Sequence, residues 1–281
     1  MADAPSRSGE CADDPFEGRF VAFVDILGFC DLVNRAKTDR RTFEWLRGAL
    51  ARIDAQAQRL EGHRQLSSSP LPGRVVSSLP RTDVTMTAFS DCYLLSERAS
   101  DNEGERSPWN LMAAVQALGS DLLARGILTR GAVVHGKAFH QDRIAFGPAI
   151  IDAYKLEKDV AKYPRILVTD RVREAIRWDN RIYWDDQLLL RDIDGSWFIN
   201  VLTPPLSKWT TVSNDTSVME TSEFLGSIRS VLEDRLREAR LNLRHLSKVK
   251  WLVHHFNLVA REHGLAINED IESTTGTQPE Q

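Results

Sequence analysis

Two aspartates stand at the ends of apolar stretches of this 281-residue chain. Asp25 interrupts the run FVAFVDILGF, and Asp91 follows the stretch DVTMTAFS. A buried acid is costly unless a counter-charge offsets it. Two carboxylates on adjacent strand ends are a common way to hold Mg²⁺, which takes oxygen ligands and keeps substrate phosphates among them. Two metal ions held in this way can activate an attacking oxygen and stabilise a leaving one.

The turn after Asp25 suits the same chemistry. Gly28 and Phe29 open this turn, and a helix is expected to follow from about Asp31. A small residue lets backbone N–H groups approach phosphates, and a helix N-terminus adds a partial positive charge. An aspartate near a strand end is also a common helix cap or turn former. The pattern alone therefore leaves cyclase, polymerase and phosphatase chemistry open.

The hydrophobic patterns predict the elements that must position these residues. We expect strands or hairpins over 20–27, 83–96, 127–139, 165–170 and 187–202, and helices over 42–60, 111–124, 148–160 and 171–177. A long helical stretch, read as one helix or two, is expected over 221–263. This order indicates an α+β domain around a mixed or mostly antiparallel sheet, with a helical C-terminal extension.

Composition predicts the domain boundaries and excludes several functions. We expect a disordered tail over 1–16, a main domain over 17–203, a linker over 204–220, helices over 221–265 and a second tail over 266–281. The net charge of −4 argues against a nucleic-acid partner. No apolar run approaches the roughly 20 residues of a membrane span, and the polar N-terminus is unlike a signal peptide. The three scattered cysteines fit reduced thiols, so we expect a cytoplasmic protein without a membrane partner.

Four motifs in sequence order resemble one family. The stretch FVDILGF resembles the first metal motif of the class III nucleotidyl cyclases, and FSDCYLL resembles the second, with Ser90 where glycine is usual. The stretch LTRGAVVHG is similar to the family's next strand, and FGPAIIDAYKLE to the helix that carries its catalytic asparagine and arginine. Over residues 18–202 the resemblance implies a ferredoxin-like cyclase catalytic domain with a central, mostly antiparallel sheet and helices.

The resemblance also implies how a site would be assembled. In this family a homodimer forms composite sites at its interface. One chain would supply the metal ligands Asp25 and Asp91, with the Ile26 carbonyl as a third, for two Mg²⁺ or Mn²⁺ ions. The other chain would supply the helix that contacts the triphosphate. The 3′-hydroxyl of a nucleoside triphosphate would attack its own α-phosphate, and pyrophosphate would leave.

The departures from the family pattern concern the transition state and the base. Ile151 stands at the family's asparagine position and Lys155 at its arginine position, so the cation is kept without the bidentate fork. Arg130 is a second candidate catalytic cation. The positions that read the purine in adenylate cyclases hold Thr87 and Ile144, which cannot make the expected contacts. ATP is therefore not the expected substrate.

One subfamily resembles the chain more fully. The series VDILGF, FSD, RGA and GPA, and the later KVKWLVHHFN, look like the bacterial pyrimidine cyclases of the Pycsar anti-phage system. Those enzymes make cyclic UMP or cyclic CMP, which triggers a separate effector. The resemblance implies a UTP or CTP substrate, with UTP preferred, and places Ile151 in substrate binding. We expect the Gly28 and Phe29 turn to bind phosphates and the Thr87 hydroxyl to contact the pyrimidine. Two alternatives stay open: a catalytically inactive, cyclase-like nucleotide-binding module and, less favoured by the charge, a palm-type enzyme.

Overall fold

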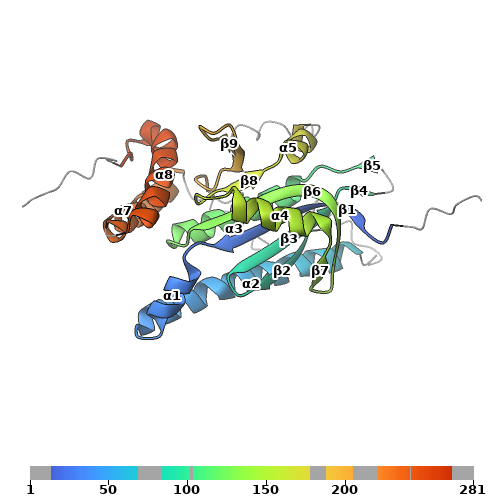
Figure 1. The fold of residues 1–281 in the computed structure, drawn as a ribbon, viewed down its shortest axis with the longest axis horizontal. Helices are drawn as coiled ribbons and strands as arrows, with labels where there is room; N and C mark the ends of the chain where they lie inside the picture. Colours follow the sequence, from blue (N-terminus) through green and yellow to red (C-terminus); the bar gives the residue numbers. More distant parts are fainter. Residues whose placement is uncertain are drawn as a thin grey trace, which may run out of the picture.

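The protein, a computed structural model, is described over residues 14–68, 84–101, 104–177, 188–204, 221–240 and 242–267. Its main sheet has the strand order β2-β3-β1-β6-β8-β10-β9, and β7 pairs with β6 (Figure 1). The strands are β1 (Glu17–Ile26), β2 (Thr85–Phe89), β3 (Cys92–Arg98), β6 (Thr129–Gln141), β7 (Ile144–Phe146), β8 (Ile166–Val168), β9 (Leu189–Arg191) and β10 (Trp197–Ile199). Among these strands, only the β6–β8 pairing is parallel.

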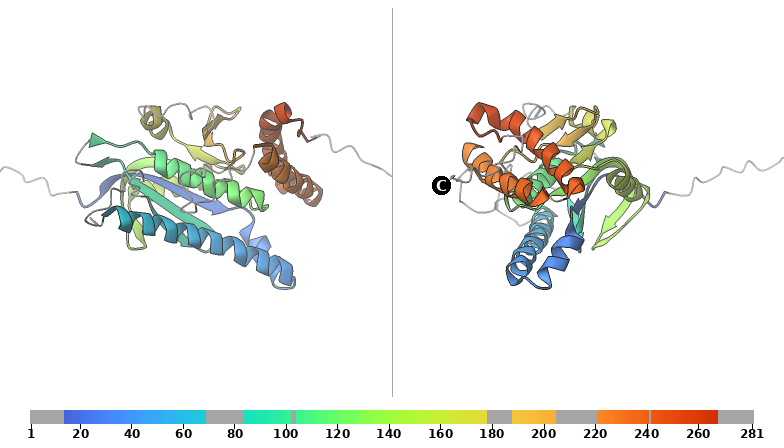
Figure 2. Two further views of the ribbon diagram at one scale, coloured as in Figure 1. Left: turned by 180° about the vertical axis from the view of Figure 1, so that it is seen from behind. Right: turned by 60° about the vertical axis from the view of Figure 1, so that its left-hand side comes forward.

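Helices cover the two faces of the sheet unequally. The helices α2 (Arg40–Ser68) and α3 (Trp109–Ala124) lie on one face, where they form the largest core cluster with β1 and β3. The helix α4 (Pro148–Asp159) lies on the opposite face, over β1 and β6 (Figure 2). The short helix α1 (Phe29–Ala36) continues directly from β1, and α5 (Asp170–Arg177) follows β8.

The C-terminal helices form a second core at one end of the sheet. The helices α7 (Thr221–Ala239) and α8 (Leu243–Ala260), followed by the 3-10 turn η3 (Arg261–His263), pack against each other. Leu123 at the end of α3 and Leu202 after β10 belong to the same apolar cluster. The extension therefore packs directly on the main domain. None of the described helices is long and apolar enough to cross a membrane.

The predicted α+β class with a mostly antiparallel sheet is confirmed, while several predicted boundaries were wrong. α2 continues to Ser68 rather than ending near Leu60, since the sequence from Leu60 to Ser68 contains no proline that would end the helix. Before α3, a short ladder pairs β4 (Ser100–Asp101) with β5 (Gly104–Glu105), and the sequence patterns did not predict it. Most of the predicted linker and tails lie outside the described residues. Phe16, at the end of the predicted N-terminal tail, contacts Phe146 with 5.6 Å between ring centroids.

The close approach of β6 to β1 at Gly131 gives a test of the fold. A Cβ atom at Gly131 would lie 2.4 Å from the carbonyl oxygen of Phe23, which is backbone and cannot turn aside. We expect Gly131→Ala to lower the free energy of unfolding by about 1–3 kcal/mol. In the exposed interior of α2, Gly48 has open space around its position, so Gly48→Ala should raise that energy by about 0.5–1 kcal/mol. Urea denaturation measures both, and equal effects would contradict the close approach.

Candidate functional site

The register of three antiparallel strands brings the two aspartates together. Asp25 in β1 lies opposite Cys92 in β3 and opposite Arg130 in β6. Asp91 precedes Cys92 in the tight turn between β2 and β3, and its carbonyl oxygen accepts a hydrogen bond of 2.9 Å from the Ile26 N–H. This bond fixes the turn against the end of β1. The two predicted metal ligands are therefore neighbours, although they are far apart in sequence.

The turn between β2 and β3 gives Ser90 a backbone conformation that favours glycine. Ser90 has a φ of 57°, in the left-handed region that favours glycine. A serine here keeps the turn at some conformational cost. With Ser90 in this conformation, Asp91 follows in the turn and its carbonyl oxygen contacts the end of β1.

Arg130 links the acidic pair to a third acid. Its Nε lies 3.2 Å from Asp25 Oδ2 and donates a hydrogen bond to it. The same Nε lies 2.6 Å from Oε1 of Glu157 in α4, whose side chain is 3% exposed. Glu157 Oε1 has no directed hydrogen bond within the described part of the chain, so its contact with Arg130 is one of charge. Arg130, a predicted catalytic cation, is thus held between two carboxylates.

Burial works against ionisation of both acids. It raises the pKa of Asp25 above the ordinary value of 3.8; Arg130 opposes this rise and Asp91 adds to it. Burial likewise raises the pKa of Glu157, against the influence of Arg130. The protein therefore stabilises the ionised carboxylates of Asp25 and Glu157 poorly. Such a site favours the binding of a further cation.

The sequence carried an unused signal for Glu157. Ala149, Ala153 and Glu157 follow one another at four-residue intervals, and all three are buried on the inner face of α4. Residues at that spacing lie on one helix face. Ile151 and Lys155 are offset from this stripe and are exposed on the outer surface of α4, with Ile151 53% exposed. Their side chains therefore point away from the acidic pair of their own chain.

The turn after β1 is open, as predicted. Gly28 caps α1 with a φ of 75°, and a Cβ atom there would meet nothing within 4 Å. The backbone conformation, rather than lack of space, thus favours glycine. The Phe29 side chain is partly buried and packs against the main core, and its role in substrate binding stays a prediction. The side chain of Ile26 is also buried, so its carbonyl is the one group it offers.

Thr87 takes part in a chain of polar contacts that links β2, β6, β3 and β1. Its Oγ1 lies 3.0 Å from Nε2 of His140, and His140 Nδ1 lies 2.9 Å from Ser96 Oγ. Arg19 Nη1 donates to the same Ser96 oxygen at 2.9 Å. His140 is 1% exposed, so it can reach a ligand only through Thr87. The sequence did not indicate that His140 contacts Thr87, because this contact depends on the path of the last residues of β6.

The donor set of the acidic pair fits a hard divalent cation. Two carboxylates and a backbone carbonyl offer oxygen ligands, and Mg²⁺ normally completes such a set with water and substrate phosphate. Within the described residues, no group of three or more His, Cys, Asp or Glu side chains is arranged to hold a metal ion without such help. The site therefore suits an ion that arrives with a phosphate ligand rather than a permanently held one.

Comparisons with known proteins give a distant likeness. No protein-family model matches the chain, and no curated protein matches it. Among solved structures, the chain is similar to the catalytic core of a rhodopsin-guanylyl cyclase with converted specificity, determined in complex with ATPalphaS. The TM-score is 0.38 at 15% identity, covering 66% of this chain and 96% of that one. A likeness at this distance is no guide to substrate or reaction.

The raised pKa of Asp25 predicts that the stability of the fold depends on pH. Because its folded-state pKa is raised, protonation favours the folded state, and that stability is lost as the pH rises through the folded pKa. We therefore expect Asp25→Asn to raise the melting temperature of the metal-free protein at pH 7.5. The gain should shrink towards zero as the pH falls to about 3.8, the ordinary value.

Thermal unfolding at several pH values measures this difference. Asp152→Asn, on the exposed surface of α4, is the matched control and should change the melting temperature little at any pH. A destabilised Asp25→Asn protein at pH 7.5 would contradict the account, since Asp25 would then be stabilising the fold through Arg130.

Proposed function

We propose that this protein is a nucleotide cyclase that converts UTP, or CTP, to the 3′,5′-cyclic monophosphate and pyrophosphate. The observation that carries the proposal is the pairing of Asp25 and Asp91 at the strand ends beside the open Gly28 turn. This combination places anionic oxygens for a cation next to backbone N–H groups for a phosphate. The motif resemblance to class III cyclases supports the same reaction.

The residues of this chain would position a triphosphate and balance its charge. Asp25, Asp91 and the Ile26 carbonyl would hold two Mg²⁺ or Mn²⁺ ions, which supply Lewis-acid polarisation of the phosphate and of the attacking hydroxyl. The N–H groups at the start of α1 would orient the phosphates. The 3′-hydroxyl would lose its proton to water and its oxygen would attack the α-phosphorus, while the bond from that phosphorus to the pyrophosphate oxygen breaks and pyrophosphate leaves. Arg130, which contacts Glu157, would stabilise the charge that develops.

The base would be read by a small polar group. Thr87 offers one hydroxyl, held by His140, where adenylate cyclases use a lysine. Ile144, at the family's aspartate position, is exposed and apolar. A hydroxyl can donate to or accept from a pyrimidine edge, whereas the two charged purine contacts are absent from these positions. A pyrimidine substrate, with UTP preferred, is the proposal that agrees with both substitutions.

A second copy of the chain would complete each site. Ile151 and Lys155 face outward on α4, so they could serve only an acidic pair in another chain. Large apolar residues are exposed on α4, just after α4, on β7 and at the end of β2: Phe89, Ile144, Phe146, Ile151, Tyr154 and Val160. Exposed apolar residues of this size are common at interfaces. We propose a homodimer with Lys155 contacting the triphosphate across it.

The biological setting follows from the resemblance. Like the pyrimidine cyclases of the Pycsar system, the protein would act in the cytoplasm during anti-phage defence. Its cyclic product would then activate a separate effector, which need not touch this chain.

One observation favours a second candidate function. Arg130 already neutralises Asp25, and Ile151 and Lys155 replace the family's transition-state residues. A catalytically inactive, cyclase-like module that binds nucleotides and regulates a partner would also have these features. Retention of two costly acids favours the enzyme, because an inactive domain gains nothing from them.

Incubation of the full chain with each of the four triphosphates and Mg²⁺ or Mn²⁺ tests the reaction. We expect cyclic product from UTP or CTP, and a loss of at least about 100-fold in Asp25→Ala or Asp91→Ala. Asp54→Ala, on the exposed surface of α2 and away from α4, is the control and should keep activity. Nucleotide binding in a calorimeter without any turnover would instead support the inactive module.

Mixing two inactive variants tests the composite site. Asp25→Ala and Lys155→Ala remove groups that the proposal assigns to opposite chains of one site. Re-associated at equal amounts, they should form heterodimers with one intact site, restoring about a quarter of wild-type activity. Asp25→Ala mixed with Asp91→Ala should restore none, because both groups belong to one chain. Equal results in the two mixtures would contradict a shared site.

A further inference from the structure

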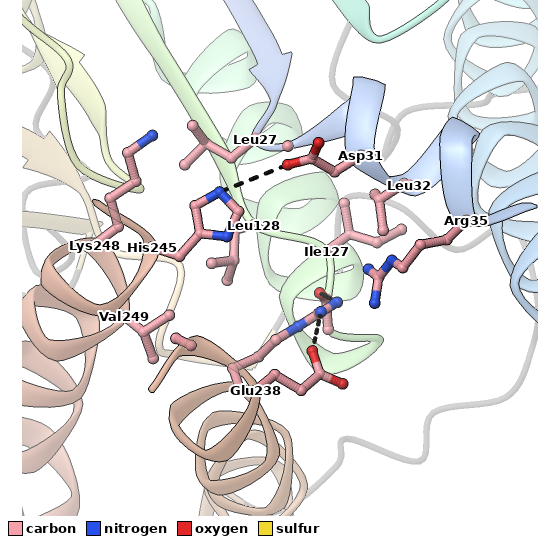
Figure 3. A pocket seen from close by; sticks show the side chains of 14 residues that line it. Leu27, Asp31, Leu32, Arg35, Ile127, Leu128, Glu238, His245, Lys248 and Val249 are labelled. Atoms are coloured by element: carbon pink, nitrogen blue, oxygen red, sulfur yellow. Dashed lines mark hydrogen bonds and ion pairs between the residues drawn. The ribbon is translucent and has the colours of Figure 1, made fainter. Parts of the chain in front are cut away.

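The C-terminal helices bring a basic side chain to the end of the sheet where the acidic pair lies. A cavity of about 290 Å³ separates α8 from the turn between β1 and α1. Leu27, Gly28 and Lys248 all line it, and Figure 3 shows Lys248 extending from α8 beside Leu27. Across the same cavity, His245 Nε2 of α8 lies 3.7 Å from Asp31 Oδ2 of α1. α8 thus forms one wall of the turn assigned to phosphates.

The charges of the candidate site act on Lys248. Burial lowers the pKa of Lys248, the positive charge of Arg130 lowers it further, and the negative charge of Asp25 raises it. Arg130 is already engaged by Asp25 and Glu157. A phosphate that entered the turn would meet Lys248 as an additional cation.

A buried polar cluster holds α8 in this position. Trp251 Nε1 donates to Asp192 Oδ2 at 2.9 Å, and Asp192 is itself paired with buried Arg165. The Trp251 ring stacks on Tyr163 with 5.6 Å between centroids. Lys248 lies one helical turn before Trp251, on the same side of α8. The anchor therefore fixes the place from which the flexible lysine stem reaches the turn.

We propose that Lys248 binds the β- and γ-phosphates of the substrate, in the same chain that supplies Asp25 and Asp91. The proposal rests on the proposed function, and it makes the C-terminal helices part of the active site. An ammonium group is an effective phosphate ligand because it is a compact charge with three donors. Within each site, Lys248 would act in cis, while Lys155 would act from the partner.

Binding of pyrophosphate with Mg²⁺ tests Lys248 without requiring turnover. We expect Lys248→Met to weaken this binding roughly tenfold or more, as loss of a charge-assisted contact does. Lys250→Met is the matched control, because Lys250 lies two residues later on the exposed side of α8, and it should bind as the wild type does. Lys248→Arg keeps the cation and should restore most of the affinity. Unchanged melting temperatures would show that all three variants fold.

Kinetics with UTP then separates this inference from the proposed function. We expect Lys248→Met to raise KM with little change in kcat. If the wild type makes cyclic product but Lys248→Met matches Lys250→Met in both assays, the role of Lys248 is overturned and the cyclase stands. Failure of pyrophosphate to bind the wild type would also overturn the role. If pyrophosphate binding depends on Lys248 but no triphosphate is cyclised, the phosphate site stands and the cyclase proposal fails.

Discussion

The arrangement of the candidate site depends on one constraint, the antiparallel register of β1 between β3 and β6. That register sets Asp25 opposite Arg130 on one side and beside the Asp91 turn on the other. A shift by one residue would turn Asp25 to the opposite face of the sheet, into the core beneath α2 and α3. The apolar residues that alternate with Asp25 along β1 hold the register, so packing energy maintains the position of an acid that burial disfavours.

Arg130 gives this arrangement a second property. Without a divalent ion it is the only cation in contact with Asp25 among the described residues, and it shares its charge with Glu157. An ion entering with a phosphate would compete with Arg130 for Asp25 and leave the guanidinium attached to Glu157. The same side chain could therefore stabilise the empty site and later contact the α-phosphate. In this account, Glu157 stays paired with Arg130 both with and without the divalent ion.

Local signals in the sequence predicted the parts of the site that local structure determines. The apolar strand, the Gly28 turn, the hairpin at Asp91 and the proline-initiated α4 follow from residue patterns within a few positions. The Thr87–His140 contact depends on the path of the last residues of β6, and the position of Lys248 depends on how α8 returns to the sheet. No short pattern encodes that return. Glu157 lies between these cases, since its helical stripe was visible but its counter-ion was not.

Diffraction from crystals grown with Mn²⁺ and a UTP analogue that cannot cyclise tests the central claim most directly. The account predicts an anomalous Mn²⁺ peak between the carboxylates of Asp25 and Asp91, with triphosphate oxygens completing its ligands at the Gly28 turn. It also predicts Arg130 displaced from Asp25 and still paired with Glu157. Nucleotide bound elsewhere, with no Mn²⁺ at the two aspartates and Arg130 still on Asp25, would contradict it.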